Sequence, residues 1–348
     1  MKLVLDAMGG DFGPAPNIEA AIDFAREFGH EIVLVGKQEV LRPLLNQRST
    51  ANLHLPIVHA SEVIEMGEHP AQAVKAKKDA SMNVGMRMVR DGEADGFVTM
   101  GNSGGALAAA LFTLGRIRGI QRPAISTVFP TTKGWVFVLD VGANADCRPE
   151  YLLQFGLMGS IYSERVLNVR KPRVAIISNG EEEGKGNELT QQAYTLLKQA
   201  PINFIGNAEG RDLPEGMADV YVTDGFTGNV IVKLSEGIGS FIKGMLREEI
   251  TRDAKGKVGG LLIRDALKRI SKRTDYEEIG GAPLLGVDGV VIIGHGRSNA
   301  RAIRCALLRA AECVERGVVD AIEKGLEALP KPDVRSSSVE RNTELKVS

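Results

Sequence analysis

The chain has 348 residues, of which 43% are apolar, and its formal net charge is −1. This length and composition allow one large domain, or two lobes, with a sizeable core. A nearly neutral chain lacks the global positive field that favours nucleic acid, so we expect no nucleic-acid partner. The three cysteines are odd in number and lack metal-binding spacing, which is typical of a reduced intracellular protein.

Short apolar runs alternate with helical patterns along the chain, which predicts an α/β fold. The predicted strands are residues 2–6, 31–35, 54–59, 96–100, 124–129, 135–140, 173–178, 202–206, 219–223 and 289–293. The predicted helices are residues 16–28, 38–46, 70–91, 104–116, 149–167, 187–199, 227–251, 259–272 and 298–328. We expect a single catalytic domain over residues 1–330, in one or two lobes around a cleft. Residues 331–348 form a polar tail that we expect to be disordered.

A turn rich in Gly, Asn, Asp or Ser follows most of the predicted strands. These turns begin at Asp6, Gly101, Asp140, Ser178, Thr223 and Gly294. In a parallel sheet the strand ends lie on one edge, so we expect the turns to converge on a single cleft. Such turns present backbone N–H groups and helix N-termini, which bind anions without Lys or Arg. The sequence therefore predicts an enzyme that handles a phosphate or another oxyanion.

One of these turns, Gly101-Asn102-Ser103-Gly104-Gly105, matches G-x-S-x-G between a predicted strand and a predicted helix. This is the context of a nucleophile elbow, in which Ser103 would attack the substrate. Asp140 or Asp224, and then His295, would complete a triad in hydrolase order. The second interpretation is an anion loop, whose small residues admit a phosphate and whose Ser103 hydroxyl donates to it. The third is a tight structural turn.

Three further residues have two interpretations each. Lys185 lies in a glutamate-rich segment, residues 180–187, that is one residue too short for a P-loop. It either meets an anion at the edge of the cleft or belongs to a solvated loop. His295, between two glycines at a predicted strand end, is either a site residue or a structural histidine. Cys147, just before a predicted helix, is either a nucleophile or a packing residue.

Residues 257–273 have the pattern of a basic amphipathic helix, within a helical insertion at about residues 255–275. Its apolar stripe consists of Leu262, Ile263, Ala266, Leu267 and Ile270, and its basic residues are Arg264, Lys268, Arg269, Lys272 and Arg273. This pattern favours contact with an anionic membrane surface or an acidic protein. The alternative is an ordinary surface helix that docks on the core.

Taken in order, the turns resemble those of the bacterial phosphate acyltransferase family (PlsX type, acyl-ACP:phosphate acyltransferase). The matching segments are residues 6–11, 101–105, 140–144, 178–186, 223–229, 276–285 and 295–296. The resemblance covers about residues 1–328, and small departures near residues 286–289 and 297–299 remove none of the motifs. Each motif alone is a weak signal, but the ordered set is specific.

The resemblance implies transfer of a fatty acyl group from acyl carrier protein to orthophosphate. The product would be acyl phosphate, which a membrane glycerol-3-phosphate acyltransferase uses in phospholipid synthesis. It also implies a homodimer without cofactor or metal. The implied fold is Rossmann-like and layered, with a largely parallel central sheet, similar to phosphate acetyltransferase and isocitrate/isopropylmalate dehydrogenases. We expect the protein in the cytoplasm, peripherally associated with the inner face of the cell membrane.

The chemistry assigns roles to the turns. Because phosphate is already ionised at neutral pH, the enzyme must mainly hold it against the thioester and stabilise the tetrahedral oxyanion. We therefore expect direct phosphate attack in a ternary complex. A serine hydrolase or acyl-Ser transferase that uses Ser103 is the alternative, and a non-enzymatic membrane scaffold is a third hypothesis. The candidate catalytic residues are Ser103, Asn102, His295, Lys185 and Asp224. The candidate phosphate or substrate ligands are Asp6, Gly9, Gly10, Gly104, Gly105, Asn144, Asn179, Gly180 and Asn229. The candidates for membrane or carrier-protein contact are Leu262, Arg264, Leu267, Lys268 and Ile270.

Overall fold

The computed structural model describes residues 1–273 and 280–329, so the predicted tail and part of the 276–285 segment lie outside the described residues. The strands are β1 (Lys2–Asp6), β2 (Glu31–Gly36), β3 (Ile57–His59), β4 (Gly96–Thr99), β5 (Ala124–Thr131), β6 (Gly134–Leu139), β7 (Arg173–Ile177), β8 (Asn203–Ala208), β9 (Val220–Val222), β10 (Ala282–Leu285) and β11 (Val290–Ile293). The helices are α1 (Pro14–Phe28), α2 (Gln38–Asn46), α3 (Pro70–Ala76), α4 (Ser81–Arg90), α5 (Ser103–Thr113), α6 (Pro149–Arg165), α7 (Glu188–Gln199), α8 (Gly225–Arg252), α9 (Ala254–Arg273), α10 (Ala300–Glu315) and α11 (Val318–Glu327), with a short 3-10 turn at Gly210–Asp212.

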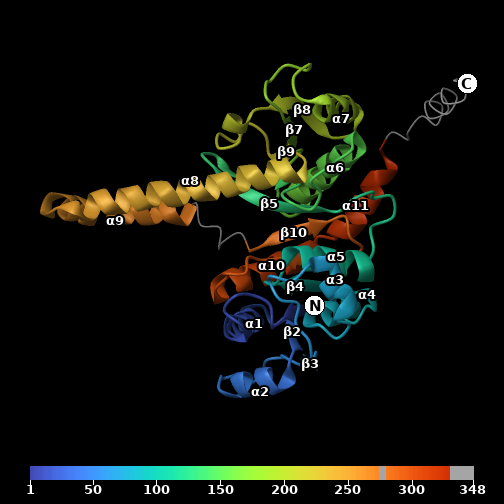
Figure 1. Ribbon diagram of the computed structural model, residues 1–348, viewed down its shortest axis with the longest axis vertical. Coiled ribbons are helices and arrows are strands. Elements are labelled where there is room, and N and C mark those ends of the chain that lie inside the picture. Colours follow the sequence, from blue (N-terminus) through green and yellow to red (C-terminus); the bar gives the residue numbers. More distant parts are fainter. Residues whose placement is uncertain (274–279, 330–348) are drawn as a thin grey trace, which may run out of the picture.

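The strands form one sheet in the order β3-β2-β1-β4-β11-β10-β5-β6-β9-β7-β8. The first five strands are mutually parallel, and the last four are mutually parallel. Between them, β10 is antiparallel to both β11 and β5, and β5 is antiparallel to β6. We call the β1-to-β4 and β11 side the first lobe and the β6-to-β9 side the second lobe; they lie below and above β10 and β5 in Figure 1.

This topology confirms a largely parallel α/β sheet but corrects one expectation. The three successive antiparallel pairings make the strands of the second lobe run opposite to those of the first lobe. The carboxyl ends of the two sets therefore lie at opposite edges of the sheet, and the predicted turns form two groups. The prediction of a single shared edge is wrong because it assumed an all-parallel sheet.

The core lies on both faces of this sheet, as expected for buried parallel strands covered by helices. Leu3, Val4 and Leu5 on β1 are fully buried, with neighbours on opposite faces of the pleat. Helix α4 packs so closely on β4 that a side chain at Gly85 would collide with the Phe97 ring. These contacts hold the strand ends, and hence the turns after them, in fixed positions.

Two predicted helices are each divided in two, and one strand was not predicted. Residues 70–91 form α3 and α4, because the Asn83 side-chain amide holds the intervening turn through Val74 O and Lys77 O, at 3.0 and 2.7 Å. Residues 298–328 form α10 and α11, separated by Gly317 at φ 58°. Strand β10 was missed because it has only four residues and contains a proline.

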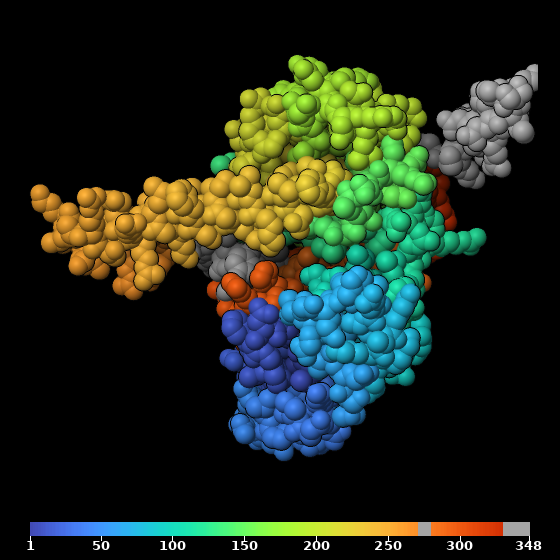
Figure 2. All heavy atoms as spheres, in the orientation of Figure 1, coloured from blue at the N-terminus to red at the C-terminus, as the bar shows by residue number. Residues whose placement is uncertain are grey.

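Helices α8 and α9 pack against each other and project from the body as a hairpin (Figures 1 and 2). The helix predicted over 259–272 begins earlier, at Ala254. The stripe residue Leu262 is 82% exposed, whereas Leu267 is partly buried. Among the described residues, no helix is both long enough and apolar enough to cross a membrane.

Candidate functional site

The turns after β1, β4 and β11 lie side by side because these strands are adjacent and parallel. Asp11 N donates to Gly296 O at 2.7 Å and Gly294 N donates to Thr99 O at 2.8 Å. A Cβ at Gly9 would lie 2.8 Å from Gly101 N, so only glycine permits this approach. The first lobe therefore brings together Gly9, Gly10, the 101–105 turn and the 294–296 turn.

The 101–105 turn forms the N-terminus of α5. Asn102 is the N-cap, and its Oδ1 accepts from Gly105 N at 3.0 Å. Its Nδ2 donates to three carbonyls of the neighbouring loop, at 3.0–3.3 Å, so this amide is not free to donate to an oxyanion. Ser103 is exposed at the first position of α5. The N–H groups of Ser103 and Gly104 have no acceptor within the helix, which leaves them open to an anion.

His295 is exposed beside this turn, and its Nδ1 accepts a hydrogen bond from Arg297 N at 3.2 Å. The two carboxylates proposed to complete a serine triad, Asp140 and Asp224, belong to turns of the second lobe. Each accepts hydrogen bonds from its own turn. The geometry therefore favours an anion loop over a nucleophile elbow.

In the second lobe, the carboxylate of Asp140 fills the turn that follows β6. It accepts hydrogen bonds at 2.7–3.2 Å from the backbone N–H groups of Ile125, Gly142, Ala143 and Asn144. Burial raises the pKa of Asp140, and these hydrogen bonds oppose that shift. The Asn144 amide also donates to Pro123 O at 2.8 Å. This turn is therefore closed to an external anion, which corrects the expectation that Asn144 donates to phosphate.

Asp224 and Asn229 fasten α8 to this closed turn. Asp224 is the N-cap of α8, and it accepts from the backbone and the hydroxyl of Thr227, at 2.8 and 2.7 Å. Asn229 Nδ2 donates to Val141 O at 3.1 Å. The Asp224 carboxylate thus has a capping role, which the D-x-x-T spacing at the start of a helix could have indicated.

The turn after β7 carries Asn179, Gly180 and Lys185. Asn179 Oδ1 accepts from Gly186 N at 2.8 Å, and the Lys185 stem lies over Gly180. Neighbouring glutamates are paired elsewhere, for example Glu183 with Lys198 at 3.0 Å. The exposed Lys185 ammonium forms no ion pair within residues 1–273 and 280–329, so it is available to an anion.

Two candidate residues are ill suited to meet a substrate, because Asp6 is buried and Cys147 is partly buried with an unreactive thiol. Asp6 is 2% exposed beneath the turns of the first lobe, and burial raises the pKa of its carboxyl. Burial and the nearby Asp140 charge raise the pKa of Cys147 to about 12, which makes its thiol a poor nucleophile at neutral pH. Its Sγ donates to Asn144 O at 3.6 Å. Cys147 is therefore a packing residue.

Sequence reasoning missed Thr99 and Asn17, which support the first-lobe turns from below. Thr99 is fully buried at the end of β4, and its hydroxyl lies between Asp6 and Gly101. Asn17 on α1 donates to Gly9 O at 2.9 Å. A polar residue at the end of an apolar strand was the available signal for Thr99.

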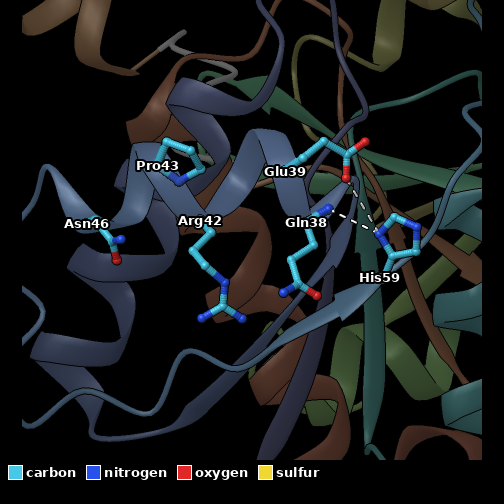
Figure 3. A pocket seen from close by; sticks show the side chains of 6 residues that line it. All are labelled: Gln38, Glu39, Arg42, Pro43, Asn46 and His59. Carbon is cyan, nitrogen blue, oxygen red and sulfur yellow. Dashed lines mark hydrogen bonds and ion pairs between the residues drawn. The ribbon is translucent and has the colours of Figure 1, made fainter.

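Two other features of the surface contain none of the first-lobe turn residues. A hollow of about 590 Å³ beside α2 and the edge strand β3 is lined by Gln38, Glu39, Arg42, Pro43, Asn46 and His59 (Figure 3). Within the described chain, the one carboxylate trio close enough to hold a metal is Glu181, Glu209 and Asp212. Arg211 already pairs with all three carboxylates, so the trio is part of a surface ion-pair cluster.

Comparison with known proteins identifies the family. Residues 1–321 match the family described as "Fatty acid synthesis protein". The chain is 51% identical over 330 residues to a phosphate acyltransferase of Endomicrobium trichonymphae, which covers 94% of this chain and 98% of that protein. It is 50% identical over 327 residues to a phosphate acyltransferase of Desulfitobacterium hafniense, with the same coverage of both chains. This chain belongs to the phosphate acyltransferase family.

Solved structures show where this family lies among folds. A phosphotransacetylase from Streptococcus pyogenes superposes with a TM-score of 0.59 at 17% identity, covering 94% of both chains. A branched-chain phosphotransacylase from Enterococcus faecalis gives a TM-score of 0.54 at 13% identity, covering 90% of this chain and 99% of that chain. The predicted likeness to phosphate acetyltransferase is therefore confirmed for the fold, whereas the likeness to the dehydrogenases stays a prediction.

Proposed function

We propose that this phosphate acyltransferase moves a fatty acyl group from acyl carrier protein to orthophosphate and binds the phosphate at the N-terminus of α5. The observation that carries the proposal is the contrast between two turns. The Asp140 turn has its N–H groups filled by its own carboxylate, whereas those of Ser103 and Gly104 at the α5 N-terminus remain open.

In the proposed reaction, a phosphate oxygen attacks the thioester carbonyl, a C–O bond forms and the C–S bond breaks. The thiolate leaves with the carrier protein and needs no strong acid. Holding phosphate against the thioester contributes about 7–11 kcal/mol of the barrier reduction. A single oxyanion donor, such as the Ser103 hydroxyl, contributes roughly 3–4 kcal/mol. His295, beside the α5 N-terminus, is proposed to complete the anion site. Lys185 lies in the turn after β7, at the opposite edge of the sheet, so it is proposed to contact the acidic carrier protein instead of the phosphate.

The alternative, a serine hydrolase or acyl-Ser transferase, has less support. Ser103 stands at a strand-to-helix turn, as an elbow requires. Its proposed carboxylate partners are occupied, since Asp140 holds its own turn and Asp224 caps α8. A serine-reactive phosphonate that inactivates the enzyme stoichiometrically would favour this alternative.

We also propose a homodimer that contacts an anionic membrane. Helix α8 carries apolar side chains that are 48–67% exposed at spacings of three or four residues, which is the pattern of a face covered by another helix. They are Phe226, Val230, Leu234, Ile238 and Phe241. A second copy of the chain is the proposed cover. On α9, Leu262 and Ile270, with Arg264 and Lys268, are proposed to lie on the inner face of the cell membrane.

This placement suits the proposed product. Acyl phosphate is amphiphilic and labile, so release at the bilayer shortens its path to a membrane glycerol-3-phosphate acyltransferase in phospholipid synthesis. The scaffold hypothesis predicts membrane binding without turnover. One assay distinguishes the acyltransferase from the scaffold: purified protein is mixed with palmitoyl-acyl carrier protein and labelled phosphate. Labelled acyl phosphate is the expected result, and its absence under conditions where the protein is folded would refute the proposed activity.

A further inference from the structure

A buried chain of hydrogen bonds joins two turns of the first lobe. Thr99 Oγ1 donates to Asp6 Oδ2 at 2.8 Å, and the same oxygen accepts from Gly101 N at 2.9 Å. Asp6 Oδ1 accepts from Met8 N at 3.2 Å. We call the chain from Asp6 through Thr99 to Gly101 the Asp6–Thr99 bridge. Asp6 and Thr99 are 2% and 0% exposed, so both lie beneath the surface that the turns present.

The residue types explain how the bridge is oriented. A carboxylate only accepts hydrogen bonds, whereas a hydroxyl carries a single proton and two lone pairs. Because the Thr99 proton goes to Asp6, a lone pair of the hydroxyl faces the Gly101 N–H. Asp6 thus determines which way the hydroxyl points, and the hydroxyl determines where the 101–105 turn begins.

The 7–13 turn rests on the same bridge. A Cβ at Gly9 would lie 2.9 Å from Asp6 Oδ2 and 3.1 Å from Thr99 Oγ1, so the Gly9 backbone lies directly against both groups. Asn17 holds this turn from its other side through Ala7 O and Gly9 O, at 3.2 and 2.9 Å. A shift of the bridge therefore displaces both turns together.

We propose that Asp6 and Thr99 are positioning residues that fix the N-terminus of α5 relative to the Gly9–Gly10 backbone. The inference rests on the proposed phosphate site at that N-terminus. It reassigns Asp6 from a phosphate ligand to a residue that acts through Thr99. The open N–H groups of Ser103 and Gly104 come two and three residues after Gly101, so a small tilt at Gly101 moves them away from a bound anion.

The decisive comparison is Thr99→Val with Thr99→Ser. Valine keeps the shape and removes the hydroxyl, whereas serine keeps the hydroxyl and removes a methyl group. We expect Thr99→Val to raise the KM for phosphate about tenfold or more and to leave the KM for the acyl donor nearly unchanged. The phosphate KM of Thr99→Ser should stay within about threefold of the wild-type value. Equal losses in both variants, or a loss in neither, would overturn the proposal.

Asp6→Asn provides a second variant and a coupling test. Asparagine preserves the shape but presents one N–H₂ where an oxygen accepts, so it should also raise the phosphate KM. Because the two residues act in series, the double variant Asp6→Asn/Thr99→Val should be no worse than the poorer single variant. Independent structural damage would instead multiply the two effects, and that result would refute the bridge. If Thr99→Val fails to fold, the phosphate KM values of the Asp6→Asn and Thr99→Ser variants test the proposal: a raised KM in Asp6→Asn and a nearly wild-type KM in Thr99→Ser support it, and any other result refutes it.

A readout independent of turnover separates this proposal from the proposed function. Hydrogen exchange of the 99–105 segment and calorimetric binding of inorganic phosphate are measured on the full chain. Faster exchange and weaker phosphate binding in Thr99→Val, but not in Thr99→Ser, support the bridge even if the wild type forms no acyl phosphate. Unchanged exchange and phosphate binding in Thr99→Val refute the bridge even if the wild type is fully active.

Discussion

Asp140 and Asn144 are joined twice, because Asp140 Oδ2 accepts from the Asn144 backbone N–H at 2.7 Å and from its side-chain amide at 2.9 Å. Since the same amide also reaches Pro123 O, Asn144 locks the second-lobe turn to the start of β5. The role of this turn is therefore structural. The turns of the two lobes have similar sequences, but they differ in whether their N–H groups can bind an anion.

The first prediction follows from that lock. Asn144→Ala should lower the free energy of unfolding by about 1–3 kcal/mol, because buried acceptors lose their donors. Urea denaturation measures the loss, and the phosphate KM of the folded variant should stay near the wild-type value. Asn203→Ala is the control, since its amide makes one exposed hydrogen bond to Lys171 O at 3.1 Å. A raised phosphate KM with unchanged stability would put Asn144 in the phosphate site.

Ser103 is predicted to be a donor and not a nucleophile. Ser103→Ala should lower activity by about 10²–10³-fold at most, which is the effect of losing one oxyanion donor. Mass spectrometry of the wild type during turnover should detect no acyl-enzyme. A stable acyl adduct trapped on Ser103 would contradict direct attack by phosphate.

Lys185 is predicted to act as a point charge for the acidic carrier protein, because its turn and the α5 N-terminus lie at opposite edges of the sheet. Lys185→Ala should raise the acyl-donor KM about tenfold while changing the phosphate KM little. Lys198→Ala is the matched control, because that lysine already pairs with Glu183 at 3.0 Å and should leave both constants unchanged. If only the phosphate KM rises, Lys185 belongs to the phosphate site instead.

The α9 stripe is predicted to bind anionic membranes. Burying Leu262, which is 82% exposed, would contribute about 1.5–3 kcal/mol, and each basic residue near the surface adds roughly 1 kcal/mol that salt weakens. Leu262→Glu should abolish flotation with anionic liposomes while turnover in solution survives, and Leu267→Glu should act in the same direction. Ile205→Glu, at a 41% exposed position on β8, is the control. Equal liposome binding by wild type and both α9 variants would exclude this role.

The Arg173–Asp219 ion pair is predicted to make stability depend on pH. Burial alone would raise the pKa of Asp219, but the hydrogen bonds and charge of Arg173, at 3.0 Å, hold it below its ordinary value. Because the Asp219 pKa is lower in the folded protein than in the unfolded chain, the ion pair stabilises the fold at pH values above the unfolded-state pKa. This stabilisation is lost as the pH falls through the folded-state pKa. Because the Arg173 side chain is 42% exposed, we expect only about 1 kcal/mol.

Unfolding of wild type and Asp219→Asn at a series of pH values measures this effect. The wild type should be the more stable protein at pH 7, and the difference should shrink as the pH falls below about 4. A difference that stays constant down to pH 3 would show that the pair contributes no titratable stability.

Local pattern alone determined much of this protein. Short apolar runs predicted β1, β2, β4, β6 and β11, because a strand buried on both faces is nearly continuously apolar. The small residues of 101–105 predicted an anion-binding turn at a helix N-terminus, since backbone N–H groups are exposed there whatever the rest of the chain does. The ordered set of turns was enough to indicate the family.

The tertiary structure decided the direction of the strands and the use of each polar group. A short strand, β10, reverses the second half of the sheet, and its four residues with Pro283 carry too little periodicity to be recognised. Asp6 and Asp140 look alike in sequence, each ending a strand before a glycine-rich turn. Asp140 closes its own turn, whereas Asp6 reaches Thr99, 93 residues away, and leaves the α5 N-terminus open. Such pairings depend on which strands become neighbours in the sheet, and the local sequence pattern does not predict the order of the strands.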